Sequence, residues 1–126
     1  MNEPAKILVV EDEGVVAMNL KMTLMGKGYN VLPIAMTANT ALTLTAQYRP
    51  QVVLMDIRIK GDKDGIDTAT LITDHYHIPI IYTTAHFDDE TVQRARATEH
   101  VAYLVKPYSE QELFDAVDKA LNGTGE

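Results

Sequence analysis

One aspartate stands where a chemically active group would be expected. Asp56 follows the apolar run Val52–Met55, which predicts a short strand buried on both faces of a sheet. In open α/β sheets, ligands bind beyond the carboxyl ends of the strands, so a carboxylate at that edge is a candidate for chemistry. The ordinary alternative is an aspartate that starts a loop or caps the next helix. Asp56 alone leaves both interpretations open.

Further polar groups follow other apolar runs. Glu11 and Asp12 follow the first run, and Thr84 and Lys106 follow two later ones. If the first and third strands are neighbours, the carboxylates repel one another unless a cation lies among them or their pKa values rise. Oxygen donors without Cys or His suit Mg²⁺. A metal, an ammonium and a hydroxyl around one carboxylate can stabilise a phosphoryl group in transfer, with Asp56 as the nucleophile that forms an aspartyl phosphate.

The rest of the chain supplies the elements that would bring these groups together. The predicted strands are 6–10, 29–35, 52–56, 80–83 and 101–105. The predicted helices are 14–27, 39–48, 65–75, 88–97 and a last one opened by the capping box of Ser109 and Glu112. This alternation predicts an α/β fold, a doubly wound five-stranded parallel sheet with helices on both faces. Pro33 removes a ladder donor from the second strand, which therefore belongs at the sheet edge.

The first predicted helix carries two apolar stripes. The stripe that would face the sheet consists of Val16, Leu20 and Leu24. A second stripe at the same spacing consists of Val15, Met18, Met22 and Met25. This is more apolar surface than one sheet face needs. We expect neighbouring helices to cover the second stripe; the alternative is a docking surface for a partner helix, since Met is favoured at adaptable interfaces.

Composition narrows the class of protein. A chain of 126 residues and 14.0 kDa predicts one domain over 1–126, with a core from about 6 to 121 and a flexible polar tail over 122–126. The absence of cysteine excludes disulfides and thiolate chemistry and suits a cytoplasmic protein. Eleven basic against 18 acidic side chains give a net charge of −7, so direct nucleic-acid binding is not expected. We also expect no membrane span and no signal peptide, because the apolar runs are short.

Taken together, the strand-end motifs resemble the receiver domain of two-component response regulators. The motifs are Val9–Glu13, Leu54–Arg58, Asp64–Asp67, Thr83–Ala85 and Leu104–Tyr108. The resemblance extends from Lys6 to Leu121 and implies a flavodoxin-like fold with strand order 2-1-3-4-5. It also implies a phosphoacceptor domain of a phosphorelay, a switch more than a turnover enzyme. Its phosphodonor would be a sensor histidine kinase or a phosphotransfer protein.

The resemblance also implies roles for single residues at the predicted site. Asp56 would be the phosphoacceptor. Mg²⁺, with Mn²⁺ as an alternative, would lie on Asp12 and Asp56. Glu11, acting through water, and the backbone carbonyl of Arg58 would complete its ligands. Lys106 would bind a phosphoryl oxygen, and its bond to the following proline is often cis in such domains.

Other implied roles concern the switch and the lifetime of the phosphate. Thr84 would move toward the phosphoryl group while Tyr103 turns inward behind it. Arg58 and His86 occupy positions that in this family tune the access of hydrolytic water. A homodimer would use the face formed by the helix 88–97 and the strand 101–105.

Two departures and two rival functions follow from the same comparison. Lys60 stands where receivers usually carry a proline, and the loop Ile59–Asp64 is one residue longer, so we expect an unusual loop geometry. A phosphatase with an aspartyl nucleophile usually needs a second acid where Arg58 stands. A phosphorylation-independent interaction module would retain the fold only, and the complete set of acidic, hydroxyl and lysine groups argues against it.

Overall fold

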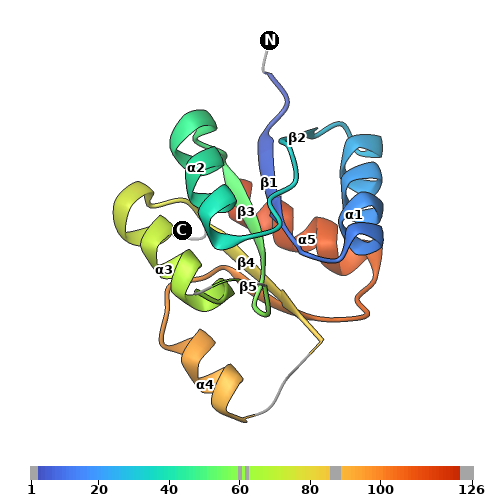
Figure 1. Cartoon of the computed structure of the whole chain (residues 1–126). Helices are drawn as coiled ribbons and strands as arrows, with labels where there is room; N and C mark the ends of the chain where they lie inside the picture. The colour runs from blue at the N-terminus through green and yellow to red at the C-terminus, as the bar shows by residue number, and fades with distance from the viewer. Residues whose placement is uncertain (1–2, 60, 62, 86–88, 123–126) are drawn as a thin grey trace.

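The chain folds into a five-stranded parallel sheet between two layers of helices (Figure 1). The structure, a computed structural model, describes residues 3–59, 61, 63–85 and 89–122. The strands are β1 (Lys6–Val10), β2 (Asn30–Val31), β3 (Val52–Asp56), β4 (Ile80–Thr84) and β5 (Ala102–Val105). The helices are α1 (Gly14–Gly26), α2 (Ala38–Tyr48), α3 (Gly65–Tyr76), α4 (Asp89–Arg96) and α5 (Glu110–Leu121). The order β2-β1-β3-β4-β5 confirms the predicted flavodoxin-like topology.

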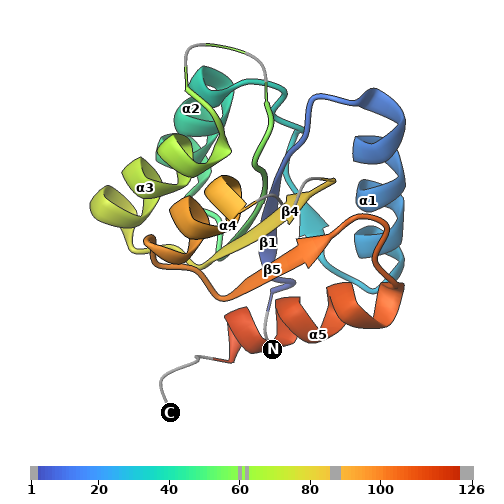
Figure 2. The ribbon, with the colours of Figure 1, turned by 90° about the horizontal axis from the view of Figure 1, so that it is seen from below.

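Each face of the sheet has its own apolar core. Leu8 and Val53 point toward α2, α3 and α4, while Ile7 and Val52 point toward α1 and α5. Figure 2 shows the two helix layers on opposite sides of the strands. Because successive strand side chains alternate between the faces, a strand covered on both must be apolar throughout. The run Val52–Met55 is buried in full for this reason.

The second strand is shorter than predicted. Regular pairing is confined to Asn30 and Val31, and an isolated bridge joins Ala35 to Val10 farther along. Between them lies Pro33, which is exposed and has no N–H to donate. Among the described strands, β2 pairs only with β1 and therefore lies at the edge of the sheet, as Pro33 predicts. The prediction of a continuous strand over 29–35 was wrong.

The expectation that neighbouring helices cover the second stripe of α1 was also wrong. Leu20 and Leu24 are buried against the sheet, as predicted. The second stripe stays exposed in fractions of 79, 53, 65 and 53% for Val15, Met18, Met22 and Met25. We call these four residues the α1 seam. In the described part of the chain, no helix long and apolar enough to cross a membrane is present.

The start of α3 is packed directly against the tip of β3. The Gly65 N–H donates to the Ile57 carbonyl oxygen at 2.7 Å. A Cβ at Gly65 would overlap the Asp56 carbonyl oxygen and come within 2.7 Å of Ile57 Cα. Glycine is therefore required here for close approach of two backbones.

We expect Gly65→Ala to lower the free energy of unfolding by about 1–3 kcal/mol, because the backbone around Asp56 must move to admit the methyl group. The matched control is Gly14→Ala, also at the first residue of a helix, where an added Cβ meets nothing within 4 Å. Urea denaturation of both variants measures the difference. Equal stability of the two variants would contradict the packing described for Gly65.

Candidate functional site

Three carboxylates meet at the carboxyl edge of the sheet. Because Val10 pairs with Met55 in adjacent parallel strands, the residues that follow β1 lie beside the end of β3. One oxygen from each of Glu11, Asp12 and Asp56 lies within 4.8 Å of the others. Glu11 is fully buried and Asp56 is 5% exposed. Two buried carboxylates this close need a positive charge near them.

Lys106 supplies that charge from the end of β5. Its Nζ lies 2.8 Å from Glu11 Oε1 and 3.4 Å from Asp56 Oδ2, with 18% of the side chain exposed. The Lys106 N–H also donates to the Thr84 carbonyl oxygen at 2.7 Å, and the peptide bond to Pro107 is cis. The ammonium group thus bridges the carboxylates of β1 and β3.

The protonation of the cluster follows from burial and charge. Burial raises the pKa of Asp56 to about 7, and the hydrogen bond with Glu11 and its negative charge act in the same direction. The charge of Lys106 and the Arg58 N–H, 3.2 Å from Asp56 Oδ1, oppose this rise. Burial acts to lower the pKa of Lys106, but the hydrogen bond with Glu11 and the charge of Asp56 outweigh it and raise that pKa. The cluster therefore favours binding of a second cation in addition to the ammonium group of Lys106.

The two threonines at the end of β4 are both buried. Thr83 pairs in register with Asp56, and its carbonyl oxygen accepts the Ile57 N–H at 3.0 Å. Thr84 is the last residue of β4, one residue beyond the predicted strand, and is fully buried at the same edge as Asp56. The structure thus brings Thr84 to the edge where the carboxylates and Lys106 meet.

Tyr103 lies farther from the acidic cluster, in β5. It is partly buried on the side of the sheet that carries α4, with its ring centroid 6.4 Å from that of Tyr82 in an edge-to-face arrangement. Tyr82 is buried, and its hydroxyl lies 2.7 Å from Thr98 Oγ1. Tyr103 therefore packs edge-to-face on Tyr82, and the Tyr82 hydroxyl contacts the segment that follows α4.

The positions predicted to tune hydrolysis are described in part. The Arg58 N–H donates to Asp56 Oδ1 at 3.2 Å. The exposed side chain of Arg58 borders a hollow of about 320 Å³ beside α4. His86 and Lys60 lie outside the described residues. Asp64 and Arg94, whose carboxylate and guanidinium groups pair at 2.7 Å, line the same hollow. This pair was missed from the sequence, since no local pattern joins residues so far apart.

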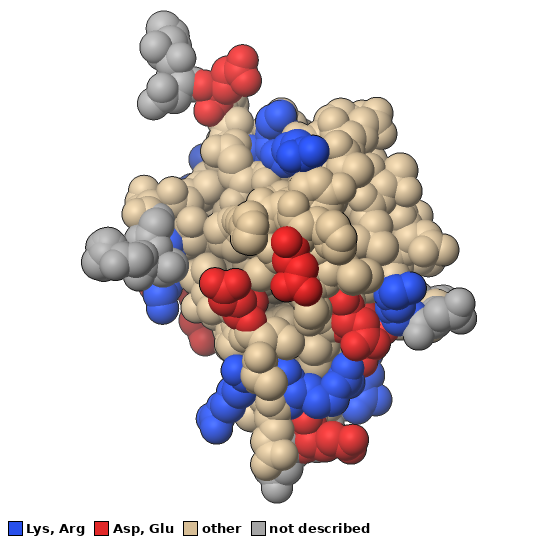
Figure 3. Space-filling model, turned by 90° about the vertical axis from the view of Figure 1, so that its left-hand side faces the viewer, with Lys and Arg blue, Asp and Glu red and all other residues tan. Residues whose placement is uncertain are grey.

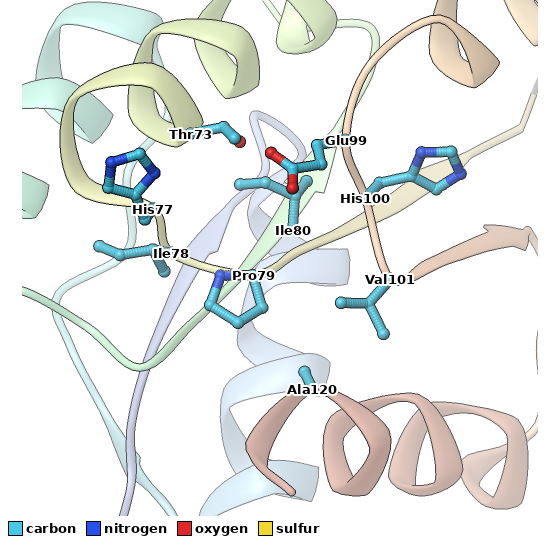
Figure 4. Close-up of a pocket in the computed structure, with 9 residues that line it drawn as sticks. All are labelled: Thr73, His77, Ile78, Pro79, Ile80, Glu99, His100, Val101 and Ala120. Carbon is cyan, nitrogen blue, oxygen red and sulfur yellow. The ribbon is translucent and has the colours of Figure 1, made fainter. Parts of the chain in front are cut away.

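Another hollow, of about 240 Å³, lies at the opposite edge of the sheet, where β4 begins (Figure 4). Figure 4 shows the Glu99 carboxylate and the Thr73 hydroxyl pointing into it, while the ring of His100 is turned away. Its histidines form no metal-binding group with other described residues. We therefore place the candidate chemistry at the acidic edge.

We expect Asp56→Asn to stabilise the metal-free protein at pH 8. The pKa of Asp56 is raised from 3.8 to about 7 on folding, so the wild-type chain loses stability as pH rises through 7. The free energy of unfolding of the variant should exceed that of the wild-type chain by at most about 4 kcal/mol at pH 8. This difference should shrink as the pH falls from roughly 7 to 4. Thermal unfolding in a chelator across this range measures it. A difference between the two chains that stays constant with pH would contradict the raised pKa.

Comparison with known proteins agrees with this geometry. The family described as the response regulator receiver domain matches residues 7–118. The transcriptional regulatory protein PdtaR of Mycobacterium tuberculosis is 34% identical over 119 residues, which cover 94% of this chain and 58% of that protein. The positive alginate biosynthesis regulatory protein of Pseudomonas aeruginosa is 38% identical over 118 residues, which cover 90% of this chain and 46% of that protein. The chain thus spans about half the length of these relatives.

Solved structures agree as well. The signal receiver domain of a modulated diguanylate cyclase from Desulfovibrio desulfuricans G20 superposes with a TM-score of 0.89 at 32% identity, covering 94% of both chains. The N-terminal domain of a response regulator/sensory box/GGDEF 3-domain protein from Carboxydothermus hydrogenoformans gives a TM-score of 0.84 at 33% identity, covering 93% of this chain and 94% of that one. With its fold, its acidic edge and the family match across nearly its whole length, the chain belongs to the response regulator receiver domain family.

Proposed function

We propose that this receiver domain is a phosphoacceptor switch of a two-component phosphorelay in which Asp56 receives the phosphoryl group. The observation that carries the proposal is the location of Asp56. It is nearly buried beside Glu11 and Asp12, with Lys106 Nζ 3.4 Å from its Oδ2. A carboxylate in such surroundings is held in place and lies next to a cation that can take up phosphoryl charge.

The donor set fits a hard divalent cation. Carboxylate oxygens from three residues lie within 4.8 Å of one another. Burial, with the adjacent Glu11 acting in the same direction, raises the pKa of Asp56, so a cation beside it would favour the ionised form. Asp12 and Asp56 would hold Mg²⁺ directly, and Glu11, through water, and the Arg58 carbonyl would complete the site. When bound, Mg²⁺ supplies positive charge that favours the ionised carboxylate and offsets the charge of the phosphoryl oxygens.

The proposed transfer requires an ionised Asp56 and a phosphohistidine donor, with the phosphoryl charge offset by Lys106 and by bound Mg²⁺. A carboxylate oxygen of Asp56 attacks phosphorus while the bond between phosphorus and the donor nitrogen breaks. The electron pair of that bond stays on the histidine ring. Lys106 would leave its contact with Asp56 to bind a phosphoryl oxygen, which the present 3.4 Å separation allows with a small movement. The new anion would then attract the buried Thr84 hydroxyl, with Tyr103 following into the space behind it.

The α1 seam suits the phosphodonor as its occupant. A groove of about 470 Å³ runs between α1 and the segment after β5, and its lining includes Val16, Leu20 and Lys106. A helix of the kinase or phosphotransfer protein that packs on the seam would lie beside this groove and bring its histidine toward Asp56. The seam residues follow the 3-4-3 spacing that helix pairs use. Docking of a partner helix replaces the expectation that neighbouring helices of this chain cover the seam, because the four seam residues are exposed.

Family membership and the lack of cysteine support a cytoplasmic location. The phosphatase alternative has little support, since the position of its second acid is occupied by Arg58. A receiver fold that acts by binding alone is the competing function, and the first of the following experiments separates it from the acceptor.

Incubation with acetyl phosphate and Mg²⁺ should add one phosphoryl group to the chain, and the adduct should be absent in Asp56→Asn. Intact-mass spectrometry measures it, with a chelator arm to test the need for metal. Asp74→Asn, an exposed aspartate on α3, is the matched control and should be phosphorylated like the wild-type chain. No adduct on a folded chain that binds Mg²⁺ would favour the binding module.

The double variant Met18→Glu and Met22→Glu should slow transfer from a phosphorylated histidine kinase by about tenfold or more, since it places charge in an apolar contact. The rate with acetyl phosphate should not change, because no protein surface is needed. Met36→Glu is the matched control, since Met36 is 47% exposed but lies outside the seam. Equal loss in the control, or none in the double variant, would contradict docking on α1.

A further inference from the structure

An ion pair joins α4 to the start of α3. Arg94 Nη1 donates to Asp64 Oδ2 at 2.7 Å, and Nη2 donates to Asp64 Oδ1 at 3.3 Å and to Asp67 Oδ1 at 3.4 Å. In Figure 3, Lys and Arg side chains gather beside Asp and Glu side chains at the height that α4 occupies in Figure 1. Both terminal nitrogens of the Arg94 guanidinium group donate to the Asp64 carboxylate, which gives this pair a defined geometry.

The Asp64 end of the pair is tied to the strand that carries the acceptor. Asp64 is the N-cap of α3, and its Oδ1 accepts the Asp67 N–H at 3.0 Å. The next residue, Gly65, is packed on the backbone of Asp56 with no room for a side chain. Asp64 therefore holds a fixed position relative to Asp56.

The α4 end is held more weakly. Among the α4 side chains that the structure describes, Thr91 and Ala95 alone are buried, and Arg94 is 43% exposed in its side chain. An element with few buried side chains moves at a lower free energy than the core. The ion pair thus adds a polar contact between α4 and the start of α3.

The pair is charged at neutral pH. Burial acts to raise the pKa of Asp64, but the hydrogen bonds from Arg94 and the Asp67 N–H lower it below its ordinary value. The bond with Asp64 in turn raises the pKa of Arg94. Both partners therefore keep their charge in the range where the switch would work.

We propose that the ion pair of Arg94 with Asp64 acts as a latch that holds α4 in its unphosphorylated position and opposes phosphorylation of Asp56. The inference rests on the proposed acceptor function. α4 is the next element after β4 along the chain, and Thr84, at the end of β4, would move toward a phosphoryl group on Asp56. A movement of α4 together with this end of β4 would separate Arg94 from Asp64, because Asp64 stays with β3. A contact that is made only in the unphosphorylated state stabilises that state. It lowers the affinity for the phosphoryl group by the factor by which it favours the unphosphorylated state.

Beryllofluoride, which adds to a carboxylate as a phosphoryl mimic, is the probe. Its Kd is measured by calorimetry at saturating Mg²⁺. Arg94→Gln should tighten binding about two- to fivefold, the range expected for an exposed pair. Asp64→Asn keeps an N-cap acceptor for α3 and removes the charge, so a smaller tightening is expected while Asp67 still contacts Arg94. The double variant should match Arg94→Gln alone, because both changes remove the same contact.

The control is Arg96→Gln, in the same turn of α4, for which the described residues show no ion pair, and its Kd should equal that of the wild-type chain. Affinity for Mg²⁺ alone should be equal in all variants, and added salt should reduce the effect of Arg94→Gln. Unchanged or weaker beryllofluoride binding in Arg94→Gln, or additive effects in the double variant, would overturn the latch. A wild-type chain that binds Mg²⁺ but no beryllofluoride would instead overturn the acceptor function on which the latch rests.

Discussion

The repulsion between Glu11 and Asp56, together with its partial relief by Lys106, is the constraint on which the site depends. Two carboxylates that are almost fully removed from water are held together by adjacent parallel strands. Lys106 Nζ lies closer to Glu11 than to Asp56, at 2.8 against 3.4 Å. Burial, together with the adjacent Glu11, raises the pKa of Asp56, so a cation beside Asp56 stabilises its ionised form.

The parallel sheet makes this crowding stable, because the strands that carry the charges are fixed by two separate cores. Ile7 and Leu8 are adjacent in β1 yet belong to different cores, one under α1 and α5 and the other under α2, α3 and α4. The free energy that opposes separation of the carboxylates therefore comes from apolar contacts on both faces of the sheet. Within this frame, Glu11, Asp56 and Thr84 lie at the carboxyl ends of their strands.

The sequence was sufficient where a local pattern maps directly onto geometry. The apolar runs at β1 and β3 predict burial on both faces, and parallel pairing then places Glu11 near Asp56. It was insufficient where the outcome depends on tertiary contacts. Pro33 was recognised as an edge residue, but the pattern did not show that it would interrupt the strand. The seam on α1 has the spacing of a buried face, and the pattern alone cannot tell whether anything packs on it.

The separation of the two cores has a consequence for how such a domain can diverge. The α1 seam and the ion pair of Arg94 with Asp64 lie on opposite sides of the sheet, and the buried residues beneath them belong to different clusters. Substitutions on the α1 seam, the proposed docking surface, therefore disturb the packing beneath α4 little, since effects at distant sites without shared contacts add independently. The proposed docking surface and the proposed latch can then be selected separately in one small domain. In a duplicated copy, one of the two surfaces could change in sequence while the packing under the other is kept.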